Sequence, residues 1–333
     1  CEPLSNLVHR DVLEPAGTTF VARRHESESA AEFLTSTDPW FRPVNLTTGP
    51  DGCLYVIDFY RASVEHPQFV RDETARKGMD WRAGSDRGRI WRIRGTEQRP
   101  SNWPKIGSAP SDELVRLLEH PNGWQRDTAQ RLLIERHDES VRDQLAELAV
   151  RSESSVTRVH ALNTLDGLGQ LWLRECELAL HDPDPEVRRH AVRLAASRAL
   201  PYEPLLRATL CAMSSDPNPR VRLQLACSLG DVPNKIGETA PEPMVAAALA
   251  RIARGGIDDE WTRTAVLSSL KESSGEFLRL FIRNEMPTMT THVTESEVEL
   301  ITQAAAVAGA RGNVDEMRAV LQQRAMGIHQ ADS

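Results

Sequence analysis

Two patterns of hydrophobic and polar residues divide this chain. Up to about residue 95, short runs rich in β-branched and aromatic residues are bounded by Gly, Pro, Asn and Asp, as in β-strands. From Ser111 onward, apolar residues recur about every 3.6 positions in successive segments, which is typical of helices. Residues 95–110 are rich in Pro, Gly and Ser and show neither pattern. The sequence therefore predicts a β region over 1–95, a linker over 96–110 and a helical region over 111–328.

The β region contains two predicted hairpins. The clearer one spans 42–61 (RPVNLTTGPDGCLYVIDFYR), where Asp51 and Gly52 lie between two strand-like runs. Both residue types tolerate the positive φ that a tight turn requires. A second hairpin is expected from strands at 7–13 and 19–23. Residues 88–94 (GRIWRIR) alternate as a further strand, and we expect one or two helical turns over 29–35.

The helical region contains an internal repeat. DPDPEVRRHAVRLA begins at Asp182 and DPNPRVRLQLACSL begins at Asp216, and the two align without gaps. Weaker copies begin at positions 120, 152, 258 and 296. In this pattern Asp caps the second helix of each pair, Val packs inward, and the following arginine (Arg188, Arg222) reaches neighbouring carbonyls or acids. The motif D-P-x-P-x-V-R, which recurs at Asp182 and Asp216, resembles the motif of HEAT repeats, so the sequence predicts an α-solenoid.

The start of the helical region has a predicted cap. Ser111 is a good N-cap residue, and Asp112 and Glu113 in the following turn are favourable at the positive end of a helix dipole. We therefore expect the first helix to begin directly after Ser111.

Composition narrows the class of protein. With 40% hydrophobic and 26% charged residues the chain is globular in type, and its net charge of −8 argues against a nucleic-acid partner and favours a basic one. No apolar run approaches the ~20 residues that span a bilayer. The 5 cysteines have no zinc-type or C-x-x-C-H spacing. The chain starts at Cys1 without a leader, which we interpret as a fragment of a longer protein.

The N-terminal third carries a family resemblance. The strings CEPLSNLVHRDVLEP, EFLTSTDPWFRPVNLTTGPDGCLYVIDFYRASVEHP and RAGSDRGRIWRI resemble the planctomycete-type membrane-bound dehydrogenases. In that family a glucose/sorbosone dehydrogenase-like β-propeller is followed by HEAT repeats and then by a cytochrome c domain. The resemblance implies that residues 1–95 are the last one to two blades of a propeller, because a full ring needs typically 4–8 blades. It also implies an extracytoplasmic (periplasmic) location, with membrane association in the full-length protein.

The polar residues around the second hairpin are the candidate binding site. Arginine pairs with carboxylates of a substrate or cofactor, and Asp58 and Glu65 are suitable ligands for a hard cation. The alternative is structural: Asp58 and Arg61 form an internal ion pair, and His66 ends a turn. The full candidate set is Arg42, Asn45, Asp58, Tyr60, Arg61, Glu65 and His66.

A second basic cluster precedes the linker, and it suggests either an anion site or a salt-bridged structural contact. Trp40, Trp81 and Trp91 are expected in the core of the β region. The cluster consists of Arg82, Arg87, Arg89, Arg92 and Arg94.

Two functions follow as alternatives. The resemblance implies part of a quinone-dependent sugar or alcohol dehydrogenase, with pyrroloquinoline quinone, calcium and haem c bound in the full-length protein and no cofactor in this chain, which alone is expected to be inactive. The HEAT array would then be a spacer and docking surface. The other hypothesis is a non-catalytic interaction scaffold or carbohydrate-binding protein, with a protein partner on the concave HEAT surface and a sugar on the propeller. Catalytic residues are not identified by the sequence.

Overall fold

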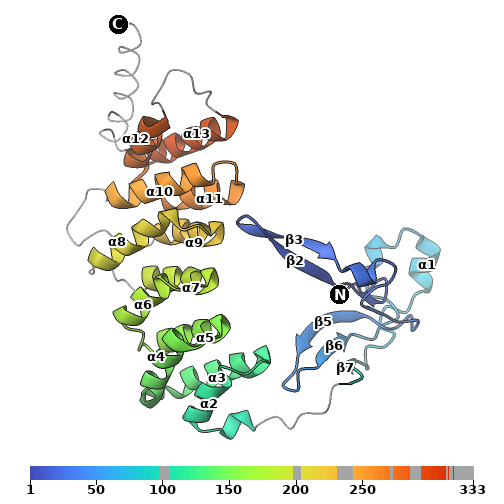
Figure 1. Ribbon diagram of the computed structural model, residues 1–333. Helices are drawn as coiled ribbons and strands as arrows, with labels where there is room; N and C mark the ends of the chain where they lie inside the picture. The colour runs from blue at the N-terminus through green and yellow to red at the C-terminus, as the bar shows by residue number, and fades with distance from the viewer. Residues whose placement is uncertain are drawn as a thin grey trace. The chain divides into compact units, whose positions relative to one another are not determined.

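The computed structural model describes residues 1–97, 105–197, 204–230, 243–270, 273–285, 294–312, 314 and 318. The chain divides into two compact units (Figure 1). Unit 1 comprises Cys1–Ala16 and Phe20–Asp138, and unit 2 comprises Gly17–Thr19 and Glu139–Ser333. The β region apart from Gly17–Thr19 belongs to unit 1, together with the first pair of helices, and each unit is described by itself below.

The β region consists of short antiparallel sheets. β5 (Pro43–Thr48), β6 (Leu54–Asp58) and β7 (Arg89–Ile93) form a three-stranded sheet in the order β5-β6-β7. The hairpin over 42–61 and the strand over 88–94 are thus confirmed. Gly52 has a φ of 75° in the connecting turn, which accounts for the Asp-Gly pair there. Two smaller sheets pair β2 (Asp11–Ala16) with β3 (Thr19–Arg24) and β1 (Leu7–Val8) with β4 (Leu34–Thr35).

The inner face of the three-stranded sheet covers a small core. Val56 of β6 is fully buried and packs with Val8 and Phe41. Because successive side chains of a strand point to opposite faces, the residue that follows, Ile57, lies on the outer face and is exposed. Leu46 lies opposite Val56 in the β5–β6 register and adds to the same core.

Some local predictions fail. Residues 29–35 do not form helical turns: a 3₁₀ helix comes earlier, at Glu26–Glu28, where the His25 side chain accepts from a backbone N–H, and residues 34 and 35 belong to β4. The short helix α1 (Glu73–Gly78), capped by Asp72, was not predicted. In the part of the chain that the structure describes, no sheet exceeds three strands. Since a propeller blade has four, the observed region is a small β region and the propeller stays a prediction.

The helical region begins within unit 1, where α2 (Ser111–Leu117) packs against α3 (Gly123–Arg136). Ser111 does not cap α2. Pro110 occupies the cap position without a side-chain bond, and Ser111 is the first helical residue. Asp112 and Glu113 do lie in the first turn, as expected.

Unit 2 is a double layer of helices (Figure 1). Helices α5, α7, α9, α11 and α13 stack on one another in one layer, and α4, α6, α8, α10 and α12 form the other. We call α5, α7, α9, α11 and α13 the second helices, because each is the second member of its helix pair along the chain. The helices are α4 (Arg142–Arg151), α5 (Ser155–Gly167), α6 (Leu173–Leu180), α7 (Pro185–Ser197), α8 (Pro204–Ala212), α9 (Pro219–Leu229), α10 (Pro243–Gly255), α11 (Glu260–Ser269), α12 (Ser274–Glu285) and α13 (Glu295–Ala310).

The core of unit 2 lies between the two layers. Leu, Phe and Ala residues spaced along the inner stripes of the helices are almost fully buried, and burial of a Leu or Phe side chain contributes roughly 1.5–3 kcal/mol. The largest of these fully buried side chains are Leu145, Leu162, Leu165, Leu180, Leu194, Leu206, Leu225, Phe277 and Phe281. The periodicity of the sequence is therefore the pattern of a two-layered helical array.

Candidate functional site

The repeated turns of unit 2 are joined by arginine–aspartate pairs. Arg188 of α7 donates from Nε and one terminal nitrogen to Asp216 in the next turn, at 2.7 and 2.9 Å. Its other terminal nitrogen donates to the carbonyls of Asp182 and Pro183 in its own turn, at 2.8 and 3.1 Å. Arg158 repeats this arrangement with Asp182, at 2.7 and 2.8 Å. Each arginine thus ties its own turn to the following one.

The two acidic positions of the repeat have different roles. Asp182 and Asp216 receive the arginine of the preceding repeat, whereas Asp184 accepts from the Glu186 N–H at 2.8 Å and so caps α7. In α9 the capping residue is Asn218, not an aspartate. The prediction that Asp caps the second helix therefore holds for α7 and for α11, which Asp259 caps, and is wrong for α5, α9 and α13.

The prediction for the repeat arginines is confirmed. Arg222 bonds the carbonyls of Asp216 and Pro217 at 2.6 and 3.2 Å, and Arg188 bonds both carbonyls and an acid.

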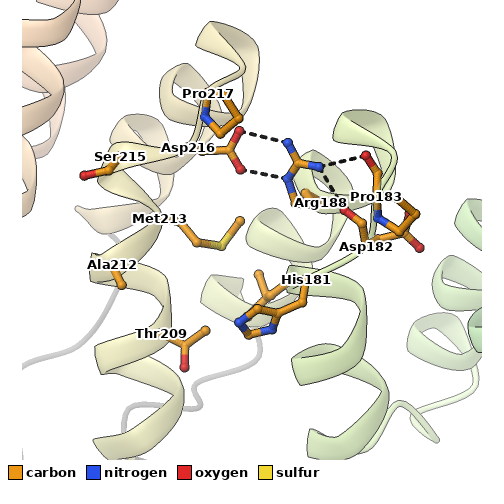
Figure 2. Close-up of a pocket in the computed structure, with 11 residues that line it drawn as sticks. His181, Asp182, Pro183, Arg188, Thr209, Ala212, Met213, Ser215, Asp216 and Pro217 are labelled. Carbon is orange, nitrogen blue, oxygen red and sulfur yellow. Dashed lines mark hydrogen bonds and ion pairs between the residues drawn. The ribbon is translucent and has the colours of Figure 1, made fainter.

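A pocket of about 580 Å³ lies beside the Arg188–Asp216 pair (Figure 2). Leu180, Met213 and the turn prolines contribute apolar surface. The charged groups in its wall face each other, and every nitrogen of the Arg188 guanidinium already donates to a partner. The pocket has the character of a gap between stacked turns, with its ionic groups committed to holding the turns together.

In the β region, Asp58 is the centre of a buried polar network. One carboxylate oxygen accepts from the backbone N–H groups of Arg42 and Tyr60, at 2.8 and 2.9 Å. The other accepts from Arg89 Nε and Trp91 Nε1, at 2.8 and 3.1 Å. Burial alone would raise the pKa of Asp58, but these four donors hold it below its usual value.

The two candidate arginines bind backbone carbonyls. Arg42 donates to the carbonyls of Pro3, Arg61 and Ala62, at 2.8, 3.0 and 2.8 Å. Arg61 donates to several carbonyls, including that of Arg87 at 2.7 Å, and stacks over the Phe59 ring. The expected Asp58–Arg61 ion pair is wrong, because the cation that reaches Asp58 is Arg89.

The remaining candidates have local contacts. Tyr60 has a φ of 51° and lies under Arg89, 3.8 Å from its guanidinium carbon to the ring centre. His66 has a local structural role, but it caps the start of a 3₁₀ helix (Pro67–Phe69) where the turn interpretation expected it to end a turn. Asn45 is exposed and accepts from the neighbouring Leu46 N–H at 2.7 Å, and Glu65 is half-buried.

The structure therefore brings Arg42, Asp58, Tyr60 and Arg61 into one network and leaves Asn45 exposed on β5 and His66 at the start of a 3₁₀ helix. The residue that the candidate set missed is Arg89. The feature that brings Arg89 to this site is the register of β6 and β7, in which Arg89 stands directly opposite Asp58. Its neighbour Arg92 pairs with Asp51 at 2.5 Å on the other face of β7, so this part of the basic cluster is a salt-bridged structural contact.

Asp51 is a second buried carboxylate of the β region whose pKa is lowered. Burial opposes its ionisation, but the Cys53 N–H and the Arg92 guanidinium lower the pKa of Asp51 to about 2. The same turn bonds α3 within unit 1. The side-chain amide of Asn122 donates to the Gly49 and Pro50 carbonyls, at 2.9 and 3.1 Å.

A further polar network crosses three second helices of unit 2, and sequence reasoning did not identify it. On α7, Glu186 accepts a hydrogen bond from Arg189 at 2.8 Å, and its other carboxylate oxygen forms an ion pair with Arg220 of α9 at 2.5 Å. Arg193 donates to Asn163 of α5 at 2.7 Å. The spacing i, i+3, i+7 along α7 was the available signal, because it places these side chains on one stripe of the helix.

Comparison with known families agrees with the division of the chain into an N-terminal β region and a helical repeat region. Residues 1–97 match a family described as a domain of unknown function (DUF7133), and residues 176–271 match HEAT repeats. The chain carries an N-terminal DUF7133 domain followed by HEAT repeats. No curated protein matches it.

The HEAT match confirms the predicted α-solenoid and includes both clear copies of the repeat. The comparisons give no dehydrogenase identity. Within the described residues, no helix is long and apolar enough to cross a membrane.

Proposed function

We propose that this chain is a protein-binding module, and that its partner docks on the exposed side of the second helices of unit 2. The stacking of α5, α7, α9, α11 and α13 carries this proposal, because it forms one extended surface from repeated elements. Exposed apolar side chains recur on that surface: Val156 on α5, Trp261 on α11 and Val298 on α13 are 47%, 60% and 53% exposed. Aromatic and aliphatic anchors of this kind supply much of the affinity of protein interfaces.

The polar candidates of the β region support a structural role for that region. Asp58 is 1% exposed and accepts four hydrogen bonds. Arg42 and Arg61 are bonded to main-chain carbonyls. A ligand carboxylate or cation would have to displace these internal partners, which makes the network a poor receptor and a good stabiliser of the loops it joins.

Site-specific photo-crosslinking tests the proposal. A photoreactive residue is placed at Thr264 of α11 or at Val298 of α13, both exposed on second helices, and the full chain is incubated with an extract of the source cells. The matched controls carry it at Arg174 or Leu178 of α6, which are exposed on a first helix. We expect discrete crosslinked partners from the second-helix positions and none from α6. Equal crosslinking from both sets would refute the proposal.

The oxidoreductase function, the β-propeller and the extracytoplasmic location remain predictions from the resemblance alone. Their test uses the full-length protein, supplied with pyrroloquinoline quinone and calcium and assayed for dye reduction over a panel of sugars. Turnover would establish the dehydrogenase function, and partner binding by the HEAT array would then be an additional function of the same protein. Absence of both turnover and quinone retention would leave the scaffold function.

A further inference from the structure

We propose that the part of the second-helix surface formed by α5, α7 and α9 binds an acidic segment of a protein partner. The proposal rests on the proposed function and deepens it, since it names the chemistry of the partner. We call this surface the arginine face, and its charged residues are Asp166, Glu186, Arg189, Arg193 and Arg220.

The charge of the arginine face is opposite to that of the chain. Three arginines stand against two acidic residues there, Glu186 and Asp166, so the face is net positive, whereas the whole chain has a net charge of −8. Arg193 is exposed, and its partner among the described residues is the neutral amide of Asn163. Its charge is thus not balanced by that contact. An anionic partner would gain from this local field even though the chain as a whole repels it at long range.

The positions of these side chains are fixed before a partner arrives. Glu186 holds Arg189 of its own helix and Arg220 of α9, so the two guanidinium groups lie on either side of one carboxylate. The Asn163–Arg193 bond ties α5 to α7 in the same way. Pre-positioned arginines lose less side-chain entropy on binding a carboxylate than free ones, and their planar donors suit bidentate contacts.

The pKa of His190 shows that the electrostatic potential around it is positive. It lies between Arg189 and Arg193, and its pKa is lowered to about 4, first by burial and then by these two arginines. Glu186 acts in the opposite direction, and His160 of α5 adds to the lowering. His190 is therefore neutral at pH 7, and carboxylates bound beside it would raise its pKa.

Apolar side chains border the arginine face. Val156 of α5 is exposed at one side, and Leu223 of α9 is half-buried next to Arg220 in the α9 stripe. A peptide that alternates acidic and apolar residues would match this surface better than a duplex nucleic acid, whose recognition requires an extended basic stripe.

Fluorescence anisotropy tests the inference with the full chain. The probe is a labelled 12-residue polyglutamate peptide at low salt, compared with a polylysine peptide of equal length. The variants are Arg193→Glu and the gentler Arg193→Gln, and the matched control is Arg174→Glu on α6, which changes the net charge equally. We expect Arg193→Glu to weaken polyglutamate binding about tenfold and Arg174→Glu to leave it unchanged. Raising the salt to 1 M, where the Debye length is about 3 Å, should abolish binding.

Imidazole NMR of His190 provides the second readout. Polyglutamate should raise the apparent pKa of His190, and circular dichroism of each variant checks that its helices are intact. Failure of polyglutamate to bind, equal loss in Arg174→Glu, or tighter binding of a DNA duplex of equal charge would each overturn the inference. A partner that crosslinks to Thr264 or Val298 independently of Arg193 would overturn it as well, while leaving the proposed function in place.

Discussion

The Arg188–Asp216 pair provides the sharpest test of how the HEAT array is held together. The Arg188 side chain is 13% exposed and that of Asp216 is 6% exposed, so the pair is largely shielded from solvent. Arg188→Met keeps much of the side-chain volume but leaves Asp216 without its cation and two carbonyls without their donor. Removing one member of such a pair costs about 3–5 kcal/mol. Asp216→Asn should cost less, because its amide oxygen still accepts from the Asn218 N–H.

The matched control is an exposed pair of the same unit. Arg151 and Glu147 of α4 are 78% and 67% exposed. Arg151→Met should therefore change stability by only about 0.3–0.5 kcal/mol. The contrast between two Arg→Met substitutions separates the effect of burial from that of deleting an arginine.

Hydrogen exchange is the suitable assay, because repeat arrays open locally and do not always unfold in one step. A loss of about 3 kcal/mol corresponds to a roughly hundredfold increase in exchange of the amides of α7 and α9. The double variant completes a mutant cycle, in which we expect a coupling of about 2 kcal/mol between the two residues. Exchange in Arg188→Met no faster than in Arg151→Met would refute the reasoning that this ion pair joins the repeats.

Three further predictions concern other parts of the chain. Asp58→Asn should destabilise the β region by about 3 kcal/mol, since it removes the charge that pairs with Arg89, and limited proteolysis of unit 1 measures it. Gly230→Ala should lower the free energy of unfolding by about 1–3 kcal/mol, because the new Cβ would lie 2.8 Å from the α11 backbone. Its control is Gly309→Ala, whose Cβ would meet nothing within 4 Å, and which should stabilise α13 by up to ~1 kcal/mol in thermal unfolding. His190 binds its proton less well in the folded than in the unfolded state, so stability should fall as pH drops from 6.5 to about 4. That slope should flatten in His190→Gln.

Periodicity was sufficient to predict the helical architecture, because HEAT packing repeats every pair of helices and each copy reinforces the pattern. The sequence also contained the ion pair of Arg188, the arginine that follows Val187. It did not reveal which aspartate receives that arginine, since the capping and receiving positions are two residues apart and chemically alike. Only the three-dimensional stacking of the turns distinguishes Asp182 from Asp184.

The β region was predicted less completely for a different reason. Its strands were visible in the alternation of residues, but its polar groups lie in contacts between segments distant in sequence. Arg89 reaches Asp58 across 31 positions, and Arg42 reaches the Pro3 carbonyl across 39. A local pattern of polar residues at a hairpin end therefore suggested a ligand site, whereas the register of β6 and β7 makes the same residues partners of one another.

The repeat pattern also identifies a missing ion pair that substitution can restore. Arg263 donates to the carbonyl six residues earlier, at Ile257, just as Arg188 does to Asp182. Ile257 thus stands at the receiving position, and Arg222 of the preceding repeat has only the carbonyls of its own turn among the contacts of the described residues. The Arg222 guanidinium lies close to the turn that contains Ile257, because its Nε is 3.8 Å from the place where a Cβ on Gly255 would stand.

Ile257→Asp should therefore create a new pair between α9 and α11. Its net effect on stability combines the gain of the pair with the loss of a half-buried apolar side chain, so the coupling with Arg222 is the quantity to measure. We expect a favourable coupling of about 1–2 kcal/mol in the cycle of Ile257→Asp and Arg222→Gln, within the range for close, partly shielded charges. Slower exchange of the α11 amides in Ile257→Asp, lost again in the double variant, would be its signature. A coupling of zero would show that the D-P-x-P turn positions its aspartate through the prolines, and that the receiving position alone is not sufficient.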